Sequence, residues 1–593
     1  MGEPPAETPK SQNPSEERLD SWKEIAAYLD RDVTTVQRWE KRESMPVHRH
    51  LHDKKGSVYA LSGELDGWLQ SRKPSLGEEQ EEPLAEAPAN ERAAQHGPGG
   101  TRRGFWAALT AVSLLAVVAV SYSVVRMHSK GASRPKIQSL AVLPLKNLSG
   151  DASQEYLAEG ITEALIGRLA GIHDLRVVSR TSVVRFKDPQ VSAAEIAKVL
   201  GVDAIVEGSV IREGSRIRVT AQLIRGATDE HFWSETYDRE FRDVLSVESE
   251  LAESIAKKVE VTVTGEEHER LKARHAVAPE VYESYLKGMY ALNRAEDRAS
   301  LEQAMNDFED ATRRDATFAP AYVGLASGYN LLGTIFIGSP PSEMRPKVIS
   351  AAQKALELDP RLAQAHLILA AVRQEQWQWT EAEAEYRRAL ELNPNDANAY
   401  AGLAFWLLCQ GRTEEALGSA RRGRELDPVA VPGGTIGDIL LLSHRSEEAI
   451  REYRSSLAVQ EDAGMLWGLG FALIEQNQPS EAIPILEKAR SISNRSPGVT
   501  GVLIRAYAHA GQRREALRLL AELKERSKVG YVPAGAFVNA YLGLGEYEEA
   551  FHWLERAREE QSNILQFVKV HPVFDPIRGD ARFVELVRRV GLG

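Results

Sequence analysis

Alanine recurs at a nearly constant interval through the C-terminal half of the chain, and this spacing restricts the fold more than any other feature. Each of the recurring alanines follows a glutamate. An interval of about 34 residues is typical of a helix pair repeated in register, with alanine where two helices cross closely and glutamate in a first turn, where the helix dipole favours it. The C-terminal half is therefore predicted to be an α-solenoid. The alanines are Ala382, Ala416, Ala449, Ala482, Ala516 and Ala550.

The order of residues within one unit resembles the tetratricopeptide repeat. Ala382, Tyr386, Ala389 and Pro394 follow its small–aromatic–small–proline pattern, and Pro360, Pro394 and Pro428 recur at the same interval as the alanines. The resemblance implies an array over residues 279–593 whose concave surface binds a protein or peptide, with a purely structural role as the alternative. Thr380, Thr413, Ser446 and Ser480 are predicted to be the matching N-caps.

One long uncharged segment interrupts an otherwise hydrophilic chain. Residues 104–125 read GFWAALTAVSLLAVVAVSYSVV and contain no charged side chain, although the mean hydropathy of the chain is −0.33. At 1.5 Å per residue this length covers a bilayer core of about 30 Å. We therefore expect a single transmembrane helix, with a buried core helix as the alternative. The small residues of the segment would permit a possible homodimer.

The N-terminal segment shows two short helices joined by a tight turn. Ser21 to Leu29 has apolar residues at helical spacing, and Ser21 with Glu24 fits a capping box. Asp32 can cap a second helix over residues 33–43, and residues 48–60 fit a small hairpin or wing. A helix over residues 61–71 closes the unit. This arrangement predicts a helix-turn-helix whose second helix enters the major groove of DNA.

The outward side chains of the second helix and the wing are suited to DNA. Basic residues exceed acidic ones by three between Arg38 and Lys55. His48, His50 and His52 alternate but lack a partner at ligand spacing, so no metal site and no cofactor is predicted. The residues expected to contact bases or phosphates are Thr34, Gln37, Arg38, Lys41, Arg42, Arg49, Lys54 and Lys55.

Residues 15–73 resemble the winged helix-turn-helix of the MerR and excisionase type. The resemblance lies in the runs SWKEIAAYLDRDVTTVQRWEKR and GSVYALSGELDGWLQSR. The chain departs from that pattern at Asp30, where family members usually carry glycine in the turn. Because DNA lies in the bacterial cytoplasm, we place the N-terminus there and the C-terminal part in the periplasm, at the inner membrane. The positive-inside rule does not favour this orientation, and the inverted topology is the alternative.

An acidic, proline- and glycine-containing segment over residues 74–103 separates the two regions. It is expected to be a disordered linker, because it cannot bury a core. Beyond the span, residues 135–264 alternate strands and helices and include a hairpin over residues 203–225. Ile217, Val219, Ala221 and Leu223 are predicted to face the core.

This α/β module resembles the N-terminal domain of TolB and the related FlgO family. The resemblance lies in LAVLPLKNLSGDASQEYLAEGITEALIGRL, LRVVSRTSV, AIVEGSVIREGSRIRVTAQLI and HFWSETYDRE. Chains of this kind often join the module to tetratricopeptide repeats and to a DNA-binding or an adenylate cyclase domain, but no cyclase-like segment is present here. Asp151 is expected to cap a helix, with anion binding as the alternative. Glu155, Glu159 and Glu163 are expected to be ordinary solvated helix residues.

The composition limits the chemistry further. Cys409 is the single cysteine, so disulfides and cysteine-rich metal sites are excluded, and no catalytic motif is found. The sequence predicts a multidomain, mainly α chain: winged helix-turn-helix, one transmembrane helix, α/β module and α-solenoid. We expect a non-enzymatic, membrane-bound transcription regulator that binds DNA at one end and a protein or peptide at the other. The alternative is a membrane-anchored envelope scaffold without DNA binding.

Overall fold

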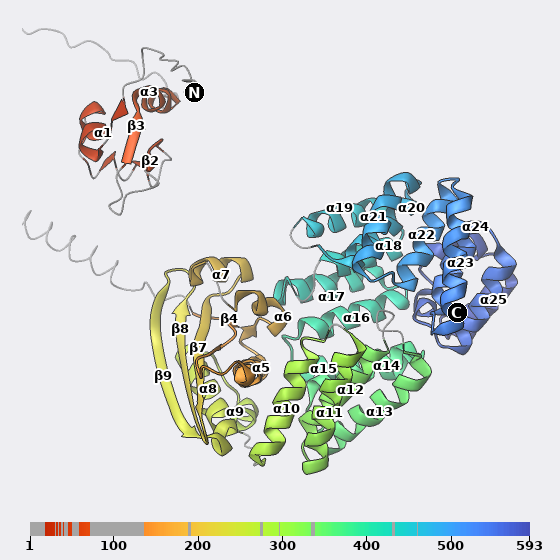
Figure 1. Cartoon of the computed structure of the whole chain (residues 1–593), viewed down its shortest axis with the longest axis horizontal. Coiled ribbons are helices and arrows are strands. Elements are labelled where there is room, and N and C mark those ends of the chain that lie inside the picture. The colour runs from red at the N-terminus through yellow and green to blue at the C-terminus, as the bar shows by residue number, and fades with distance from the viewer. Residues whose placement is uncertain are drawn as a thin grey trace, which may run out of the picture. The chain divides into compact units, whose positions relative to one another are not determined.

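The computed structural model divides into two compact units, residues 1–119 and 120–593, which are described separately (Figure 1). It describes residues 18–71, apart from 20, 30, 32, 34, 37–38, 41–44 and 50–57, and residues 136–593, apart from 188–190, 273–276, 296, 334–338, 430–432 and 459–460. The predicted linker over residues 74–103 and the predicted span over residues 104–125 lie outside the described residues.

The smaller unit contains a three-stranded antiparallel sheet in the order β1-β3-β2. The strands are Arg18–Leu19, His48–Arg49 and Val58–Leu61, numbered in chain order, and the helices α1 and α3 are Trp22–Tyr28 and Ser62–Ser71. Pairing of His48 with Tyr59 and of Arg49 with Val58 confirms the predicted hairpin. Strand β1 was not predicted from the sequence.

Buried side chains from the described helices and strands of this unit form its core. Ile25 of α1, Ala60 of β3 and Leu65 of α3 are fully buried, and so is Val36 in the predicted second helix. The backbone N–H of Glu24 donates to Ser21 Oγ over 3.3 Å, so Ser21 caps α1 as expected. The described residues therefore pack as a small α/β unit around one apolar centre.

The larger unit begins with a sheet in the order β6-β4-β7-β8-β9, with β5 also paired to β7. The three long strands are β7 (Ala204–Glu213), β8 (Arg216–Arg225) and β9 (Glu230–Glu240), joined as antiparallel neighbours. The four predicted core residues of β8 are all buried, which confirms the alternation read from the sequence. The short strands are β4 (Ser139–Val142), β5 (Lys146–Asn147) and β6 (Arg176–Val177).

Helices pack on this sheet and lead into the array. Figure 1 shows α5 (Glu155–Ala170) and α8 (Val244–Lys258) between the long strands and the helical array. Leu251 and Ile255 of α8 and Ile161 and Leu165 of α5 are fully buried against the sheet. The remaining elements are η1 (Ala152–Gln154), α6 (Arg180–Val183), η2 (Val184–Phe186), α7 (Ala193–Leu200), η3 (Phe241–Asp243) and α9 (Gly265–Lys272).

Sixteen helices, α10 to α25, follow as antiparallel pairs among the described residues, which gives the chain its mainly helical character. The first helices of the pairs are α10 (Pro279–Leu292), α12 (Ala319–Leu332), α14 (Ala363–Glu375), α16 (Ala397–Cys409), α18 (Gly433–Leu442), α20 (Ala463–Glu475), α22 (Pro497–His509) and α24 (Ala534–Leu544). The second helices are α11 (Arg298–Arg314), α13 (Pro341–Leu358), α15 (Trp379–Leu392), α17 (Thr413–Leu426), α19 (Ser446–Leu457), α21 (Pro479–Ile492), α23 (Arg513–Val529) and α25 (Tyr547–Glu559).

The alanine ladder lies on the second helices, and all six alanines are completely buried. Close approach also involves glycine: a Cβ on Gly402 of α16 would lie 2.5 Å from the Tyr386 ring of α15. Small residues at these crossings let neighbouring helices pack at short distance. The predicted α-solenoid is therefore confirmed.

The caps of the second helices differ from the prediction. Thr413 and Ser446 are the first residues of α17 and α19, while Thr380 and Ser480 are the second residues of α15 and α21. No side-chain hydrogen bond caps any of these four helices. The prediction of N-caps at these positions is therefore wrong by one or two residues.

The prediction of a single-pass inner-membrane location, with a cytoplasmic N-terminus and a periplasmic C-terminal part, is wrong. In the part of the chain that the structure describes, no helix is both long enough and apolar enough to cross a bilayer. The most apolar of the described helices, α20, has 13 residues, which at 1.5 Å each fall well short of a hydrocarbon core of about 30 Å. Its apolar side chains are buried within the array instead.

Candidate functional site

The described residues of the smaller unit hold the predicted wing against the closing helix. His48 of β2 lies 2.7 Å from Glu64 of α3 and stacks on Tyr59, with ring centroids 5.1 Å apart. Trp39 packs against Trp68 of α3, with ring centroids 5.7 Å apart. His48 thus anchors β2, the first strand of the predicted wing. In the described part of the chain, no group of three or more His, Cys, Asp or Glu residues could hold a metal ion.

The side chains predicted to contact DNA fall outside this description. Arg49 is placed as a backbone position in β2, paired with Val58. The other predicted residues, Thr34, Gln37, Arg38, Lys41, Arg42, Lys54 and Lys55, lie outside the described residues. DNA contact by these eight side chains stays a prediction.

In the larger unit, two successive repeat turns dock on the α/β module. Asp427, which follows α17, accepts a hydrogen bond from the Ser179 backbone N–H over 2.7 Å and another from the Ser182 hydroxyl. Asn395, which follows α15, donates its side-chain N–H to the carbonyls of His173 and Leu175 over 3.1 and 3.2 Å. Because Asp427 is 2% exposed, the joint excludes water and fixes the array to the module.

A network of charges strengthens this joint near α5. Glu159 is 5% exposed and contacts Arg180 and Lys187 over 3.0 Å each, and Arg294 from the turn between α10 and α11 also pairs with it. Burial opposes ionisation of Glu159, but hydrogen bonds from Arg294 and Lys187 hold the pKa of its carboxyl below the usual value. The expectation that Glu159 is a solvated helix residue is therefore wrong, because the array covers that face of α5.

A second carboxyl at the same joint is held differently. Glu248 of α8 is 1% exposed, accepts a hydrogen bond from the Tyr282 hydroxyl of α10 and lies 3.8 Å from Arg168. Burial raises the pKa of Glu248 to about 7, against the opposing effect of the Arg168 charge.

Asp151 accepts a hydrogen bond from the Ser153 backbone N–H over 2.9 Å, which confirms that it caps the helix start.

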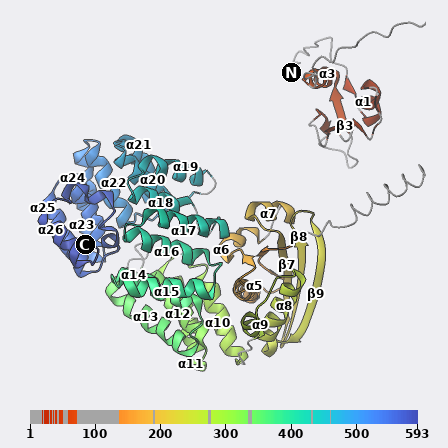
Figure 2. The same cartoon turned by 180° about the vertical axis from the view of Figure 1, so that it is seen from behind.

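Residues 561–593, here called the C-terminal segment, cover the row of first helices in the second part of the array. The segment contains η4 (Asn563–Phe567), η5 (Pro572–Ile577) and α26 (Ala581–Arg589), the last lying beside α25 in Figure 2. Gln566 accepts a 2.9 Å hydrogen bond from Gln374 of α14, and the ring centroids of Phe567 and Phe405 of α16 are 6.1 Å apart. The ring centroids of the buried His571 and of Phe471 of α20 are 4.9 Å apart.

The amount of apolar surface in these contacts makes the segment part of the core. Nine of its aliphatic and aromatic side chains are buried with the array in one cluster. Burial of each such side chain contributes roughly 1.5–3 kcal/mol, so a ligand that displaces the C-terminal segment would have to compensate for the loss of well over 10 kcal/mol of burial free energy. The concave surface predicted to bind a peptide is filled in this part by the chain itself. These residues are Leu565, Val568, Val573, Phe574, Ile577, Phe583, Leu586, Val590 and Leu592.

Two contacts tie the ends of the C-terminal segment to helices far earlier in the chain. Arg345 of α13 donates to the Gln561 carbonyl over 2.8 Å and pairs with Glu375 over 3.0 Å. The Trp379 indole N–H donates to the Val590 carbonyl over 2.9 Å. These contacts close the curved array, and no regular sequence spacing signals them.

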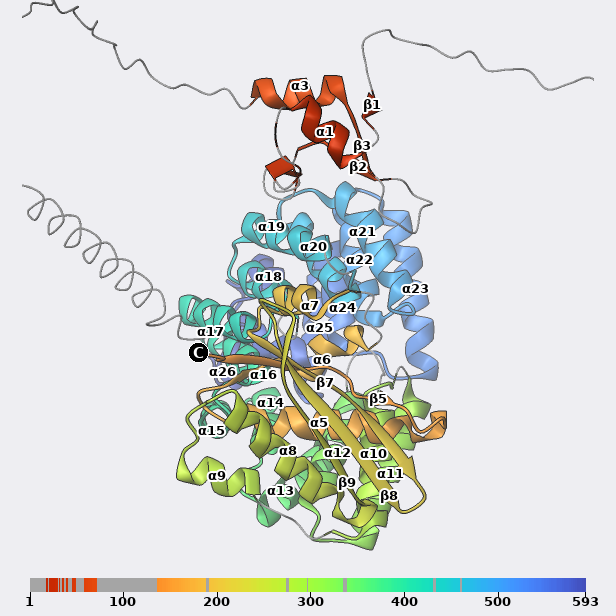
Figure 3. The same cartoon turned by 90° about the vertical axis from the view of Figure 1, so that its left-hand side faces the viewer.

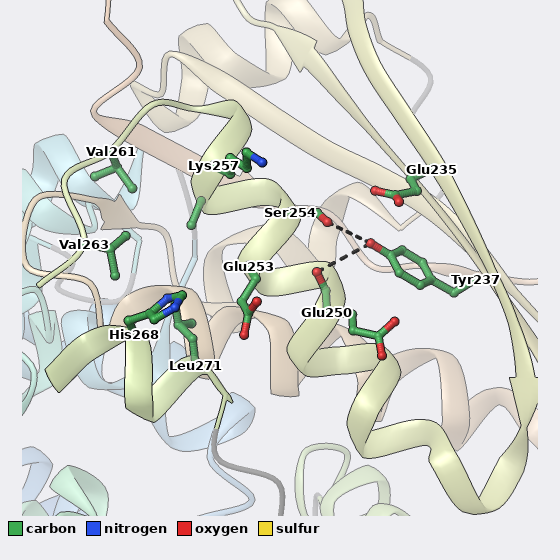
Figure 4. A pocket seen from close by; sticks show the side chains of 11 residues that line it. Glu235, Tyr237, Glu250, Glu253, Ser254, Lys257, Val261, Val263, His268 and Leu271 are labelled. Carbon is green, nitrogen blue, oxygen red and sulfur yellow. Dashed lines mark hydrogen bonds between the residues drawn. The ribbon is translucent and has the colours of Figure 1, made fainter. Parts of the chain in front are cut away.

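An open groove of about 540 Å³ lies between the edge strand β9 and the helices α8 and α9. Figure 4 shows Glu235 and Tyr237 on the strand facing α8, with Glu253 of α8 and His268 of α9 around the same hollow. The Tyr237 hydroxyl donates to Ser254 Oγ over 3.0 Å. The groove has an acidic wall, formed by Glu235, Glu250 and Glu253, next to the outer edge of β9.

Models of known protein families match two parts of the chain, the repeat array and the α/β module. Models of the tetratricopeptide repeat match residues 385–418 and 473–528, so the array contains these repeats. Residues 136–256 match the second domain of HilA/YgeH-like transcriptional regulators. That match covers the α/β module; the resemblances of this module to TolB and FlgO and of the smaller unit to MerR are not tested by it.

Among curated proteins, the chain is similar to "Putative adenylate cyclase 3" of Rhizobium meliloti (strain 1021), with 36% identity over 240 residues. The match covers 40% of this chain, and the chain spans about two fifths of that relative's length. Among solved structures it is similar to YrrB, described as a TPR protein with an unusual peptide-binding site, with 21% identity, 31% of this chain and 91% of the other covered and a TM-score of 0.22. For MamA protein the identity is 16%, the coverage 36% and 91%, and the TM-score 0.21.

Proposed function

We propose that this protein is a transcription regulator whose N-terminal domain binds DNA and whose repeat array binds a protein or peptide. The match of residues 136–256 to a domain of transcriptional regulators carries the proposal. The folded unit before that domain, with its capped helix and its hairpin, supplies a further domain that could read DNA. The tetratricopeptide repeats supply the expected partner-binding part.

In this function the second helix and the wing of the smaller unit would contact DNA. Gln37 and Arg38 would read bases, while Lys41, Arg49 and the paired lysines Lys54 and Lys55 would hold phosphates. The array is joined to the α/β module by Asp427 and its neighbours, so a partner on the repeats would act on a rigid body rather than on a free arm. We propose no enzymatic activity for the chain.

Binding to duplexes selected from a random-sequence library tests the DNA-reading part. The double variant Arg38→Ala with Lys41→Ala is expected to weaken binding at least tenfold and, because Lys41 is the phosphate contact of the two, to lower the slope of log affinity against log salt by about one. The matched control replaces Arg421 and Arg422, which lie on α17 in the array, and should leave binding unchanged. An unchanged affinity and salt slope in the first variant would refute the assignment and favour a protein-interaction scaffold.

A further inference from the structure

Strand β9 is a long strand, and from Trp233 to Glu240 no described strand pairs with its outer side. It runs from Glu230 to Glu240, and among the described strands it forms the edge of its sheet next to β8 (Figure 3). At 11 residues it is about twice as long as an average strand. The opposite edge is β6, which has two residues and lies at the joint with the array.

Exposed edges of this length usually carry devices that prevent pairing, such as lysine, proline or a bulge. Strand β9 contains neither lysine nor proline, and its one register shift lies near Phe232, but five of its 11 residues are charged, so only a strand with a complementary charge pattern can pair with it. From Trp233 to Glu240 it pairs with β8 residue by residue. The regular part of the edge is therefore open to another strand.

The side chains of this regular part are complementary to a second copy of themselves. We propose that two chains pair through β9 as antiparallel neighbours, with Tyr237 on the two-fold axis. In this register Glu235 lies opposite the partner chain's residue 239, an arginine, and Thr236 lies opposite its residue 238, an aspartate. The symmetric contact therefore contains two Glu–Arg pairs and two Thr–Asp pairs, and no two like charges lie directly opposite one another.

Neighbouring registers are less favourable. Moving the axis by two residues to Glu235 would place the two Glu235 carboxylates opposite one another and bring the bulged Phe232 into the pairing. An axis at Thr236 keeps the strands regular but places Arg239 opposite Trp233 and Glu235 opposite Tyr237, with no ion pair. The register centred on Tyr237 is selected by charge and by the position of the bulge.

The groove beneath the edge fits the same arrangement. Glu235, Tyr237 and Arg239 lie on the face of β9 that pairs with the buried side of β8, towards α8. The open groove lined by Glu235, Glu250 and Glu253 lies next to this edge and is acidic on that side. Arg239 of the same chain is 49% exposed and pairs with Glu250 over 3.5 Å, so Glu235 is the carboxylate of this wall that the partner's Arg239 would meet.

Such a dimer would bring together two N-terminal domains for paired half-sites on DNA. Only this use of the dimer rests on the proposed function; the contact itself rests on the geometry and charge of β9. The two can be tested separately, because the mass of the protein and its affinity for DNA are measured independently.

Charge exchange across the axis tests the pairing in the full chain. Light scattering and sedimentation of the wild type are expected to give twice the chain mass of 65.6 kDa. Glu235→Arg alone and Arg239→Glu alone should each weaken the dimer at least tenfold, and the double variant should restore it to within about threefold of wild type. The control Arg242→Glu lies beyond the end of β9, is 73% exposed and should leave the mass unchanged.

Two results would overturn the pairing: a mass of 65.6 kDa at every concentration up to the tens of micromolar, or a double variant no closer to wild type than the single ones. Circular dichroism confirms that each variant folds. If wild type is dimeric and the rescue succeeds while no DNA is bound, the pairing stands and the proposed function fails. If the protein is monomeric but binds DNA, the proposed function stands and the pairing fails.

Discussion

Arg345 is the residue whose replacement tests the closure of the array most sharply. The residue is 6% exposed, and its guanidinium donates to the Gln561 carbonyl over 2.8 Å and pairs with Glu375 over 3.0 Å. In Arg345→Met the aliphatic part of the side chain is kept, while the Gln561 carbonyl and the Glu375 carboxylate lose their partner. The change therefore isolates the polar contribution of this contact.

The magnitude follows from the kind of groups involved. A hydrogen bond to a charged group contributes about 1.5–3 kcal/mol, and a buried carbonyl left unpaired costs about 1–3 kcal/mol. The Glu375 side chain is 31% exposed and can regain water, so its share is small. We expect a loss of about 2–4 kcal/mol, localised to the C-terminal segment and to α13 and α14.

Amide hydrogen exchange measures this loss locally. With tenfold for each 1.4 kcal/mol, residues 561–592 should exchange roughly 30 to 700 times faster in Arg345→Met, while helices α10 and α11 keep their protection. The control is Arg387→Met, which removes an exposed pair with Glu383 of 2.6 Å within α15 and should change exchange by less than about threefold. Equal effects of the two variants, or uniform acceleration throughout the array, would refute the closure by Arg345.

Three further changes test the larger unit. Burial raises the pKa of Glu248 to about 7, above the unfolded value, so native stability falls as pH rises towards and through 7. The melting temperature of Glu248→Gln relative to wild type should therefore increase between about pH 5 and pH 8, and a difference independent of pH would contradict this. Asp427→Ala should loosen the joint by about 3 kcal/mol and expose the β6–α6 connection to limited proteolysis, whereas Asp359→Ala, two repeats earlier and 20% exposed, should have little effect; equal cleavage would argue against the joint. Cys409 is fully buried and its thiol pKa is raised by that burial, so it should react with a thiol reagent only in denaturant, and fast reaction of the native protein would show that the core is open.

The repeat array could be predicted from the sequence because its signal is local and repeated. An alanine that must fit a helix crossing recurs at the same place in each unit, and all six are buried. The starts of the second helices were less accessible to prediction. Arg412 occupies the cap position of α17 but makes no side-chain capping hydrogen bond, and the helix begins at Thr413. A threonine in the first turn and one at the cap look alike in sequence.

The contacts between distant segments could not be predicted. The ladder would require a small residue at position 584, and the exposed Val584 there marks the end of the repeats. Nothing in the sequence, however, shows that Gln566 lies against Gln374 or that Arg294 covers Glu159. These pairs join segments far apart in the chain, and their partners are fixed only when the array curves and the module docks.

The central claim is that the protein recognises DNA, and selection of random-sequence duplexes by the full chain tests it most directly. The account predicts that repeated rounds enrich a discrete sequence motif and that binding to it falls steeply with salt. Replacing the basic residues of the predicted second helix and wing should abolish that enrichment. A library that remains unenriched after selection by the folded wild-type protein would contradict the account.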